Sequence, residues 1–270
     1  MRISVYVPQH AVIEAISPAY RLFKTANDFL AAAGKKPKFE VEYVGLHKSI
    51  KANDGEYSIK VDKLIDEIKK TDLIFIPALY GNMKTAVSRN AKAIPWLQQM
   101  HKKGAEVASL CIGAFLLGAT GLVDGKKCST HWAYCGEFKE TYPKVEIVDG
   151  SIITEQGSVY SSGGANSLWN LLLYLLEKFT DRETAVLASK YFAIDIDRSS
   201  QSAFAMFTGQ KHHSDKEILK AQEYIENNIH EKITTNVLAT VTTLGRRTFE
   251  RRFKDATHHS VLEYIQRIKI

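Results

Sequence analysis

Cysteine is scarce in this chain, and long apolar runs and targeting segments are missing. Three cysteines in 270 residues form an odd and sparse set, which argues against a disulfide framework and for a reducing compartment. No apolar run approaches the roughly 20 residues that a membrane span needs. The first residues, MRISVYVP, pass directly into a strand pattern and lack the basic and apolar regions of a signal peptide. We therefore expect a cytoplasmic protein without a membrane partner.

Signatures of bound metals and phosphate cofactors are also missing. The pair Gly163-Gly164 is short and fits neither the G-x-G-x-x-G nor the Walker pattern. Cys128 and Cys135 flank His131 with the spacing C-x2-H-x3-C, which is not a closed zinc pattern and offers no fourth ligand. The sequence therefore predicts neither a metal nor a cofactor.

The first two-thirds of the chain alternate between strand and helix patterns. Apolar, β-branched runs predict strands at residues 3–7, 39–46, 73–77 and 106–110. Helical spacing predicts helices at residues 18–33, 61–70, 94–103, 112–119 and 165–179. Three short strands with two turns are expected between residues 145 and 161. This rhythm predicts an α/β fold with a flavodoxin-like, doubly wound parallel sheet covered by helices on both faces.

Length and periodicity divide the chain into two domains. A chain of 270 residues is long enough for one sizeable α/β domain and a small appendage. Between about residues 195 and 213 the periodicity fades and serine and glycine become frequent, which is typical of an interdomain connection. We expect an α/β domain over residues 1–190, a linker over 191–213, and a small all-α segment over 214–270.

The last segment predicts one short helix with two opposed faces. At about 100° per residue, Phe249, Phe253 and Ala256 form an apolar stripe. The opposite side gathers charged side chains, namely Arg247, Glu250, Arg251 and Lys254. From residue 244 onward the net charge is +4, out of +6 for the whole chain. Such a face can pair with phosphates or guanine edges, and a solvated basic face on an ordinary packed helix is the alternative.

Two shorter helical patterns precede this helix. Residues 215–228 place apolar side chains at helical spacing, with Ser214 as the expected N-cap. Residues 234–236 open a second helix, and residues 242–245 form a tight polar turn. Three helices in this order predict a helix-turn-helix whose third helix enters the groove of DNA.

These residues resemble the AraC family of transcriptional regulators. The resemblance is carried by the pattern I-x3-VLAT-x3-LGRRTFERRFK-x5-S-x2-EYIQRIKI. It implies sequence-specific DNA binding through five residues of the third helix: Arg246, Arg247, Glu250, Arg251 and Lys254. Arg246 and Lys254 would contact phosphates, and the other three would contact bases.

Three departures from the AraC pattern stand out. Gly245 replaces the usual serine, so the side-chain N-cap of the recognition helix is lost at a cost of a few tenths of a kcal/mol. His258 or His259 replaces a common glycine in the following loop. AraC-type domains hold two helix-turn-helix units joined by a long helix, and the sequence stops at Ile270 inside the expected connecting helix. We therefore expect the second unit to be missing, and a homodimer to supply the contact area that one unit lacks.

The chemistry of the first domain centres on one cysteine between a strand and a helix. Cys111 follows the strand at 106–110 and precedes Ile112, Gly113 and a helix, which is the arrangement of a nucleophile elbow. The helix N-terminus offers N–H groups and a positive dipole end, and both favour a thiolate. A small core residue after a buried strand is the alternative interpretation.

The surrounding motifs resemble the ThiJ/PfpI family of the class I glutamine amidotransferase-like superfamily, in the form fused to one AraC subgroup. These motifs are C-x-GAF-x-L at 111–117, GL-x-DG at 121–125 and THW at 130–132. The resemblance covers roughly residues 1–190 and implies a domain that senses a ligand or dimerises. Its site would consist of Glu14, Cys111, Ile112, His131, Gly163 and Gly164.

Catalysis is the alternative function. The hydrolase and peptidase members of the superfamily place histidine directly after the nucleophile, where this chain has Ile112. A base must lie within hydrogen-bond reach of the thiol. His131 could serve only if the fold brings it near, and it could instead satisfy a backbone group in a loop. We expect a non-enzymatic transcriptional regulator that binds DNA and an unknown small-molecule effector. The alternative is a thiol-dependent amidase or aldehyde-modifying enzyme that uses Cys111, Glu14 and His131.

Overall fold

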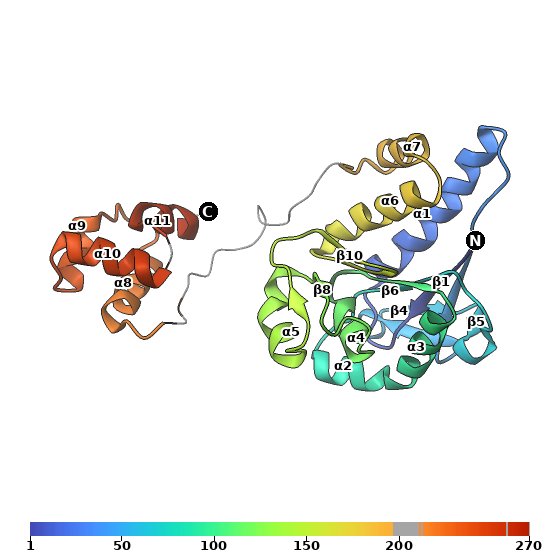
Figure 1. The fold of residues 1–270 in the computed structure, drawn as a ribbon, viewed down its shortest axis with the longest axis horizontal. Coiled ribbons are helices and arrows are strands. Elements are labelled where there is room, and N and C mark those ends of the chain that lie inside the picture. Colours follow the sequence, from blue (N-terminus) through green and yellow to red (C-terminus); the bar gives the residue numbers. More distant parts are fainter. Residues whose placement is uncertain (197–210, 212, 258, 270) are drawn as a thin grey trace. The chain divides into compact units, whose positions relative to one another are not determined.

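A seven-stranded sheet and a separate group of helices organise the chain (Figure 1). The computed structural model describes residues 1–196, 211, 213–257 and 259–269. The chain forms two compact units, an α/β unit before the segment of residues 197–210 and a helical unit after it. The greater part of the predicted linker, residues 191–213, lies outside the described residues.

The sheet of the α/β unit has the strand order β10-β11-β7-β6-β1-β2-β5. Its strands are β1 (Arg2–Val7), β2 (Glu40–Gly45), β5 (Lys63–Leu64), β6 (Leu73–Ile76), β7 (Glu106–Ser109), β10 (Ile153–Gln156) and β11 (Val159–Ser162). All neighbours pair in parallel except β10 and β11. The five longer parallel strands follow the order 2-1-3-4-5 of a flavodoxin-like sheet, so the predicted fold class is confirmed.

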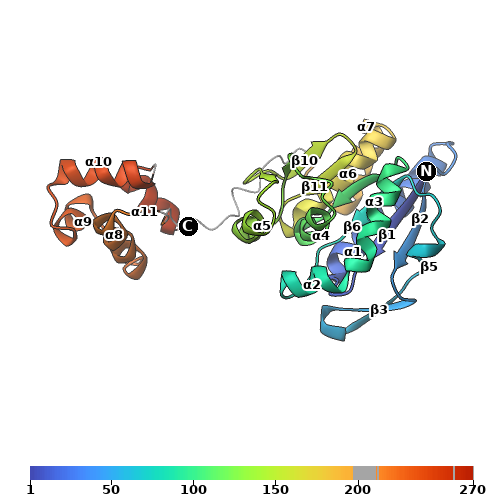
Figure 2. The ribbon, with the colours of Figure 1, turned by 60° about the horizontal axis from the view of Figure 1, so that its bottom comes forward.

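Helices cover both faces of this sheet (Figures 1 and 2). One face packs against α1 (Ile13–Ala32) and α6 (Leu168–Phe179), and α7 (Arg182–Phe192) contacts both. The other packs against α2 (Met83–Arg89), α3 (Ile94–Lys102), α4 (Ala114–Ala119) and α5 (Cys135–Thr141). Because both faces are covered, β6 is buried at every position, as its uninterrupted apolar sequence predicts.

Short elements complete the α/β unit. Two small sheets lie beside the main one, formed by β3 (Ser49–Ala52) with β4 (Tyr57–Lys60), and by β8 (Lys127–Cys128) with β9 (Glu146–Ile147). Single 3-10 turns occur at η1 (Asn53–Gly55), η2 (Ile65–Glu67), η3 (Ala91–Ala93), η4 (Cys111–Gly113), η5 (Trp132–Tyr134) and η6 (Ala165–Ser167).

The helix predicted at residues 61–70 is wrong. This segment holds β5 and a single 3-10 turn, because its backbone bonds go to β2. The Asp62 N–H donates to the Tyr43 carbonyl oxygen at 2.9 Å, and an Asp62 carboxylate oxygen accepts from the Tyr43 N–H at 2.8 Å. Lys63 and Leu64 pair in register with Val44 and Gly45. Tertiary pairing therefore overrides the helical spacing.

The first helix begins earlier than its proline suggests. Helix α1 starts at Ile13, and Pro18 lies buried inside it. The N-cap, Val12, has no side-chain hydrogen bond, and the one start signal in the sequence is Glu14 in the first turn.

The helical unit contains α8 (Lys216–Asn227), α9 (Thr235–Val241), α10 (Arg246–Thr257) and α11 (Val261–Lys269). Its core gathers apolar and aromatic side chains from all four helices, including Ile218, Leu238, Phe249, Phe253 and Tyr264. The predicted cap at Ser214 is wrong by one position, because the Asp215 side chain accepts from the Ile218 N–H. In the part of the chain that the structure describes, no helix is long and apolar enough to cross a membrane.

Candidate functional site

Cys111 lies at a strained turn between β7 and α4. Its φ of 55° is in the left-handed region, which side chains other than glycine adopt at a cost. Gly113 is needed two residues later, because a Cβ there would lie 2.4 Å and 2.5 Å from the carbonyl oxygens of Ile76 and Pro77. The close passage of this turn over the end of β6 therefore fixes the position of the cysteine.

A cavity of about 440 Å³ opens beside this turn. It brings together four predicted site residues, Glu14, Cys111, Ile112 and His131. The remaining lining residues were not predicted, and they are Val12, Ala15, Ala78, Tyr134, Ala165, Asn166, Leu168 and Trp169. Gly163 and Gly164 are not among the lining residues. Their neighbour Ser162 supports the turn instead, since its Oγ accepts from the Cys111 N–H at 3.2 Å.

The thiol of Cys111 is in an apolar environment. Burial raises the pKa of Cys111 to about 11, although a hydrogen bond from the Ile112 backbone opposes the shift. Glu14 is exposed and accepts from Asn53 Nδ2 at 3.4 Å and 3.5 Å. Among the described residues, no carboxylate or imidazole forms a hydrogen bond with the thiol. This environment favours the neutral thiol and not the thiolate.

His131 is held next to the turn by its own segment. Thr130 Oγ1 donates to the Cys111 carbonyl oxygen at 3.3 Å, and His131 Nδ1 accepts from the Ala133 N–H at 3.2 Å. Burial lowers the pKa of His131, so the ring is neutral near pH 7. Because Nδ1 is the acceptor, the proton of the neutral ring resides on Nε2. In this tautomer Nε2 carries the proton, so it cannot accept one from a thiol.

The cysteine and histidine side chains do not form a metal site in the described residues. No group of three His, Cys, Asp or Glu side chains there could hold an ion. Cys128 is fully buried, and its thiol donates to the Ser129 carbonyl oxygen at 3.6 Å. Cys135 donates to the His131 carbonyl oxygen at 3.7 Å.

Helix α10 has the two faces that its periodicity predicts. Phe249 and Phe253 are fully buried, and the side chain of Arg251 is 71% exposed. Arg246, Arg247 and Lys254 are also exposed, and Glu250 is partly exposed and accepts from Arg246 at 3.0 Å. The five predicted DNA-binding residues therefore lie on the side of α10 away from the core.

Arg252 has a different environment from its neighbours, which the sequence did not indicate. Its guanidinium donates two hydrogen bonds, at 2.6 Å and 2.8 Å, to the carboxylate of Asp215. The hydrogen bond from Arg252 is the main cause that lowers the pKa of Asp215. This carboxylate also caps α8, so one residue joins α8 to α10. The sequence could not have indicated this pair, because Asp215 lies 37 residues before Arg252 and only the fold brings the two together.

The turn between α9 and α10 is well bonded. Thr234 caps α9 by accepting from the Val237 N–H, and Thr243 has a left-handed φ of 53°. Leu244 N–H donates to the Ala239 carbonyl oxygen at 3.0 Å. Gly245 borders open space, and its carbonyl oxygen accepts from the Phe249 N–H at 2.9 Å. One of the two loop positions that replace the usual glycine, His258, lies outside the described residues.

The sequence is similar to those of known transcriptional regulators and of a known enzyme. The regulator GbdR of Pseudomonas aeruginosa, named an HTH-type transcriptional regulator, is 25% identical over 226 residues, which is 83% of this chain and 60% of GbdR. An isonitrile hydratase of Pseudomonas putida is 24% identical over 129 residues, covering 48% of this chain and 54% of the enzyme. The chain spans between half and two-thirds of the length of the curated regulators that it matches.

Solved structures confirm the fold. The crystal structure of an AraC family transcriptional regulator from Pseudomonas putida superposes with a TM-score of 0.61 at 19% identity. The match covers 71% of this chain and 98% of that one. Residues 2–178 match the DJ-1/PfpI family, and these residues contain the sheet, the strained turn and the cavity. The chain belongs to the DJ-1/PfpI family.

Proposed function

We propose that the chain is a transcriptional regulator that binds DNA sequence-specifically through α10. The observation that carries the proposal is the exposed basic face of this helix, set after a tight turn on a packed four-helix core. Exposed arginines on such a helix can form bidentate pairs with guanine and charge-assisted bonds with phosphate. In this assignment Arg247, Glu250 and Arg251 contact bases, and Arg246 and Lys254 contact phosphates.

The domain assignment follows from this function. Residues 1–190 form a DJ-1/PfpI sensing domain, residues 191–213 a linker, and residues 214–270 an AraC-type helix-turn-helix. The names of the regulators that the chain matches support this arrangement, as does the apolar helix core behind α10. A homodimer would let two copies contact two half-sites, and a regulator of this kind acts in the cytoplasm.

The cavity beside Cys111 is assigned to a small-molecule effector. Its lining is mainly apolar and aromatic, with the polar groups of Glu14, His131 and Asn166 at separate points, which is typical of ligand pockets. Sensing is favoured over catalysis because the thiol is protonated near pH 7 and the His131 tautomer is not a base towards it. Catalysis is the alternative function, because some relatives are named as enzymes.

DNA binding can be tested on the whole chain. The affinity for the DNA upstream of its own gene is measured by fluorescence anisotropy at several salt concentrations. We expect log K to fall linearly with log salt, and Arg251→Ala to weaken binding about tenfold or more. Lys102→Ala is the matched control, because Lys102 is an exposed cation on α3 of the α/β unit and its loss should change little. A flat salt dependence, or equal losses in both variants, would contradict the proposal.

A further inference from the structure

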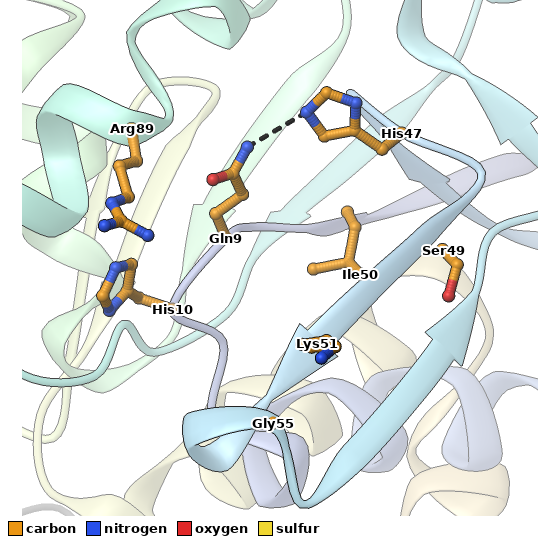
Figure 3. Close-up of a pocket in the computed structure, with 8 residues that line it drawn as sticks. All are labelled: Gln9, His10, His47, Ser49, Ile50, Lys51, Gly55 and Arg89. Carbon is orange, nitrogen blue, oxygen red and sulfur yellow. Dashed lines mark hydrogen bonds between the residues drawn. The ribbon is translucent and has the colours of Figure 1, made fainter.

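A second cavity, separate from the one beside Cys111, lies at the carboxyl ends of β1 and β2 (Figure 3). Its volume is about 480 Å³. Residues from three parts of the chain converge on it: Gln9 and His10 after β1, His47 after β2, and Arg89 at the end of α2. The β3–β4 hairpin closes the other side (Figure 3). Ligands of open α/β sheets bind outside the carboxyl ends of the strands, where the strand order reverses; this cavity lies at the same edge, one strand away from that point.

The lining of this cavity is strongly cationic. Lys51 from β3 and Arg89 carry full positive charges, and both are exposed. Neither forms an ion pair with a carboxylate among the described residues. Figure 3 shows Arg89 beside His10 on one side of the cavity and Lys51 on the hairpin. Two cations without counter-charges on facing elements create a local positive potential, which attracts an anion.

Polar contacts hold Gln9 and His47 in place before any ligand binds. Asn90, which follows Arg89, is fully buried. Its Oδ1 accepts from the Gln9 N–H at 2.9 Å, and its Nδ2 donates to the Gln9 carbonyl oxygen at 2.8 Å. Gln9 Nε2 in turn donates to His47 Nε2 at 3.1 Å (Figure 3). Because the Gln9 amide nitrogen can only donate, His47 Nε2 is the acceptor, and Nδ1 is the ring nitrogen that can donate to a ligand.

His10 has two features that are typical of a functional position. Its φ of 60° is in the left-handed region, where a non-glycine residue is strained. Its Nε2 is buried and has no hydrogen-bond partner among the described residues. A buried imidazole nitrogen without a partner is unfavourable, so His10 is strained in both its backbone and its side chain at the edge of the cavity.

We propose that this cavity binds a small molecule through its phosphate group, with Arg89 and Lys51 as the main charge partners. The donors come from the segments after β1 and β2, from β3 and from α2, so they approach a ligand from several directions. A phosphate has three terminal oxygens that accept from several directions, whereas a carboxylate is satisfied by one planar guanidinium fork. Donor geometry therefore favours phosphate over carboxylate.

The two cavities share one segment of the chain. Gln9 and His10 line the cationic cavity, and Val12, Glu14 and Ala15 line the cavity beside Cys111. Ala11, between them, forms bridges to Ala52 of the hairpin and to Leu79. The phosphate site is therefore adjacent to the proposed effector site, but it contains none of the residues that line it.

Isothermal titration of the full chain with inorganic phosphate tests this site. Sodium acetate and sodium chloride at equal ionic strength serve as the comparison anions. We expect phosphate to bind, acetate to bind at least tenfold more weakly, and chloride to give no saturable signal. Lys51→Ala and Arg89→Ala should each weaken phosphate binding by about tenfold or more, because each removes one charge-assisted contact.

Lys84→Ala is the matched control, because Lys84 is an exposed cation on α2 that does not line the cavity. It should leave phosphate affinity unchanged, and thermal unfolding in chloride should show that all three variants remain folded. Equal affinity for acetate, equal losses in the control, or the absence of phosphate binding would overturn the proposal. No DNA is present in this assay, so its outcome is independent of the regulator function.

Discussion

The cavity beside Cys111 takes its lining from five separate stretches of the α/β unit, whereas the charged face of α10 comes from nine consecutive residues. The first site exists only because strand ends that are distant in sequence meet at one edge of the sheet. The second exists wherever the helix forms, because helical periodicity alone separates its two faces. Substitutions near the cavity should therefore disturb folding, and substitutions on the exposed face of α10 should disturb binding only.

Gly113→Ala should have the largest effect. The added Cβ would contact two backbone carbonyl oxygens at 2.4 Å and 2.5 Å, and backbone cannot move aside as a flexible side chain can. We expect a loss of about 3 kcal/mol or more in the free energy of unfolding of the α/β unit. Urea denaturation followed by tryptophan fluorescence measures it, because Trp96, Trp132 and Trp169 all lie in this unit.

Gly136→Ala is the control for that experiment. Gly136 lies in the first turn of α5, and a methyl group added there would have no neighbouring atom within 4 Å. Its replacement by alanine should leave stability unchanged or raise it slightly. Similar losses of stability in both variants would show that the contact of an added Cβ with the carbonyl oxygens of Ile76 and Pro77 is not the cause of the destabilisation.

Cys111 should react slowly with thiol reagents. A pKa of about 11 in place of 9.0 lowers the thiolate fraction at pH 7.5 by about 100-fold. The rate of alkylation should keep rising with pH through 9 and 10, because the thiolate appears only near the raised pKa. Mass spectrometry of the Cys111 peptide measures the rate, with the unfolded chain as the reference. A rate at pH 7.5 equal to that reference would favour the catalytic alternative.

Asp215→Ala should have the smallest of these effects, and it should act within the helical unit. The variant loses the cap of α8 and the contact with Arg252, at a combined cost of about 1–2 kcal/mol. Hydrogen exchange of the α8 and α10 amides measures this local loss. Asp215→Asn retains a capping oxygen and should lose less.

The same carboxylate predicts a pH dependence. Since the pKa of Asp215 is lowered in the folded chain, its stabilisation is fully present above its ordinary pKa of about 3.9. It is lost as the pH falls through the lower folded value. Protection of α8 that is equal at pH 7 and at pH 2 would contradict this assignment.

The sequence predicted the helical site more completely than the cavity. The spacing of Phe249 and Phe253 places Arg247 and Arg251 on the opposite face, and the structure has them there. It did not predict that Arg252, which is not on this face, bonds Asp215. That bond joins two helices, and helical spacing within one element contains no information about a neighbouring helix.

In the α/β unit, the sequence predicted the central motif of the site but not the residues around it. The strand-cysteine-helix pattern located the turn at Cys111, because a nucleophile elbow has a local signature. Tyr134 and Trp169 reach the cavity only through tertiary packing, and no local pattern marks them. The β3–β4 hairpin was missed for a similar reason, since its position depends on contacts such as the hydrogen bond from Asn53 to Glu14.

The segment shared by the two cavities has a thermodynamic consequence. If a phosphate compound bound at His10 shifts residues 9–15, it changes the affinity of the cavity beside Cys111 by some factor. Linkage then requires a ligand in that cavity to change phosphate affinity by the same factor. A chain with this arrangement would respond to two metabolites jointly, and its occupancy by one would depend on the concentration of the other.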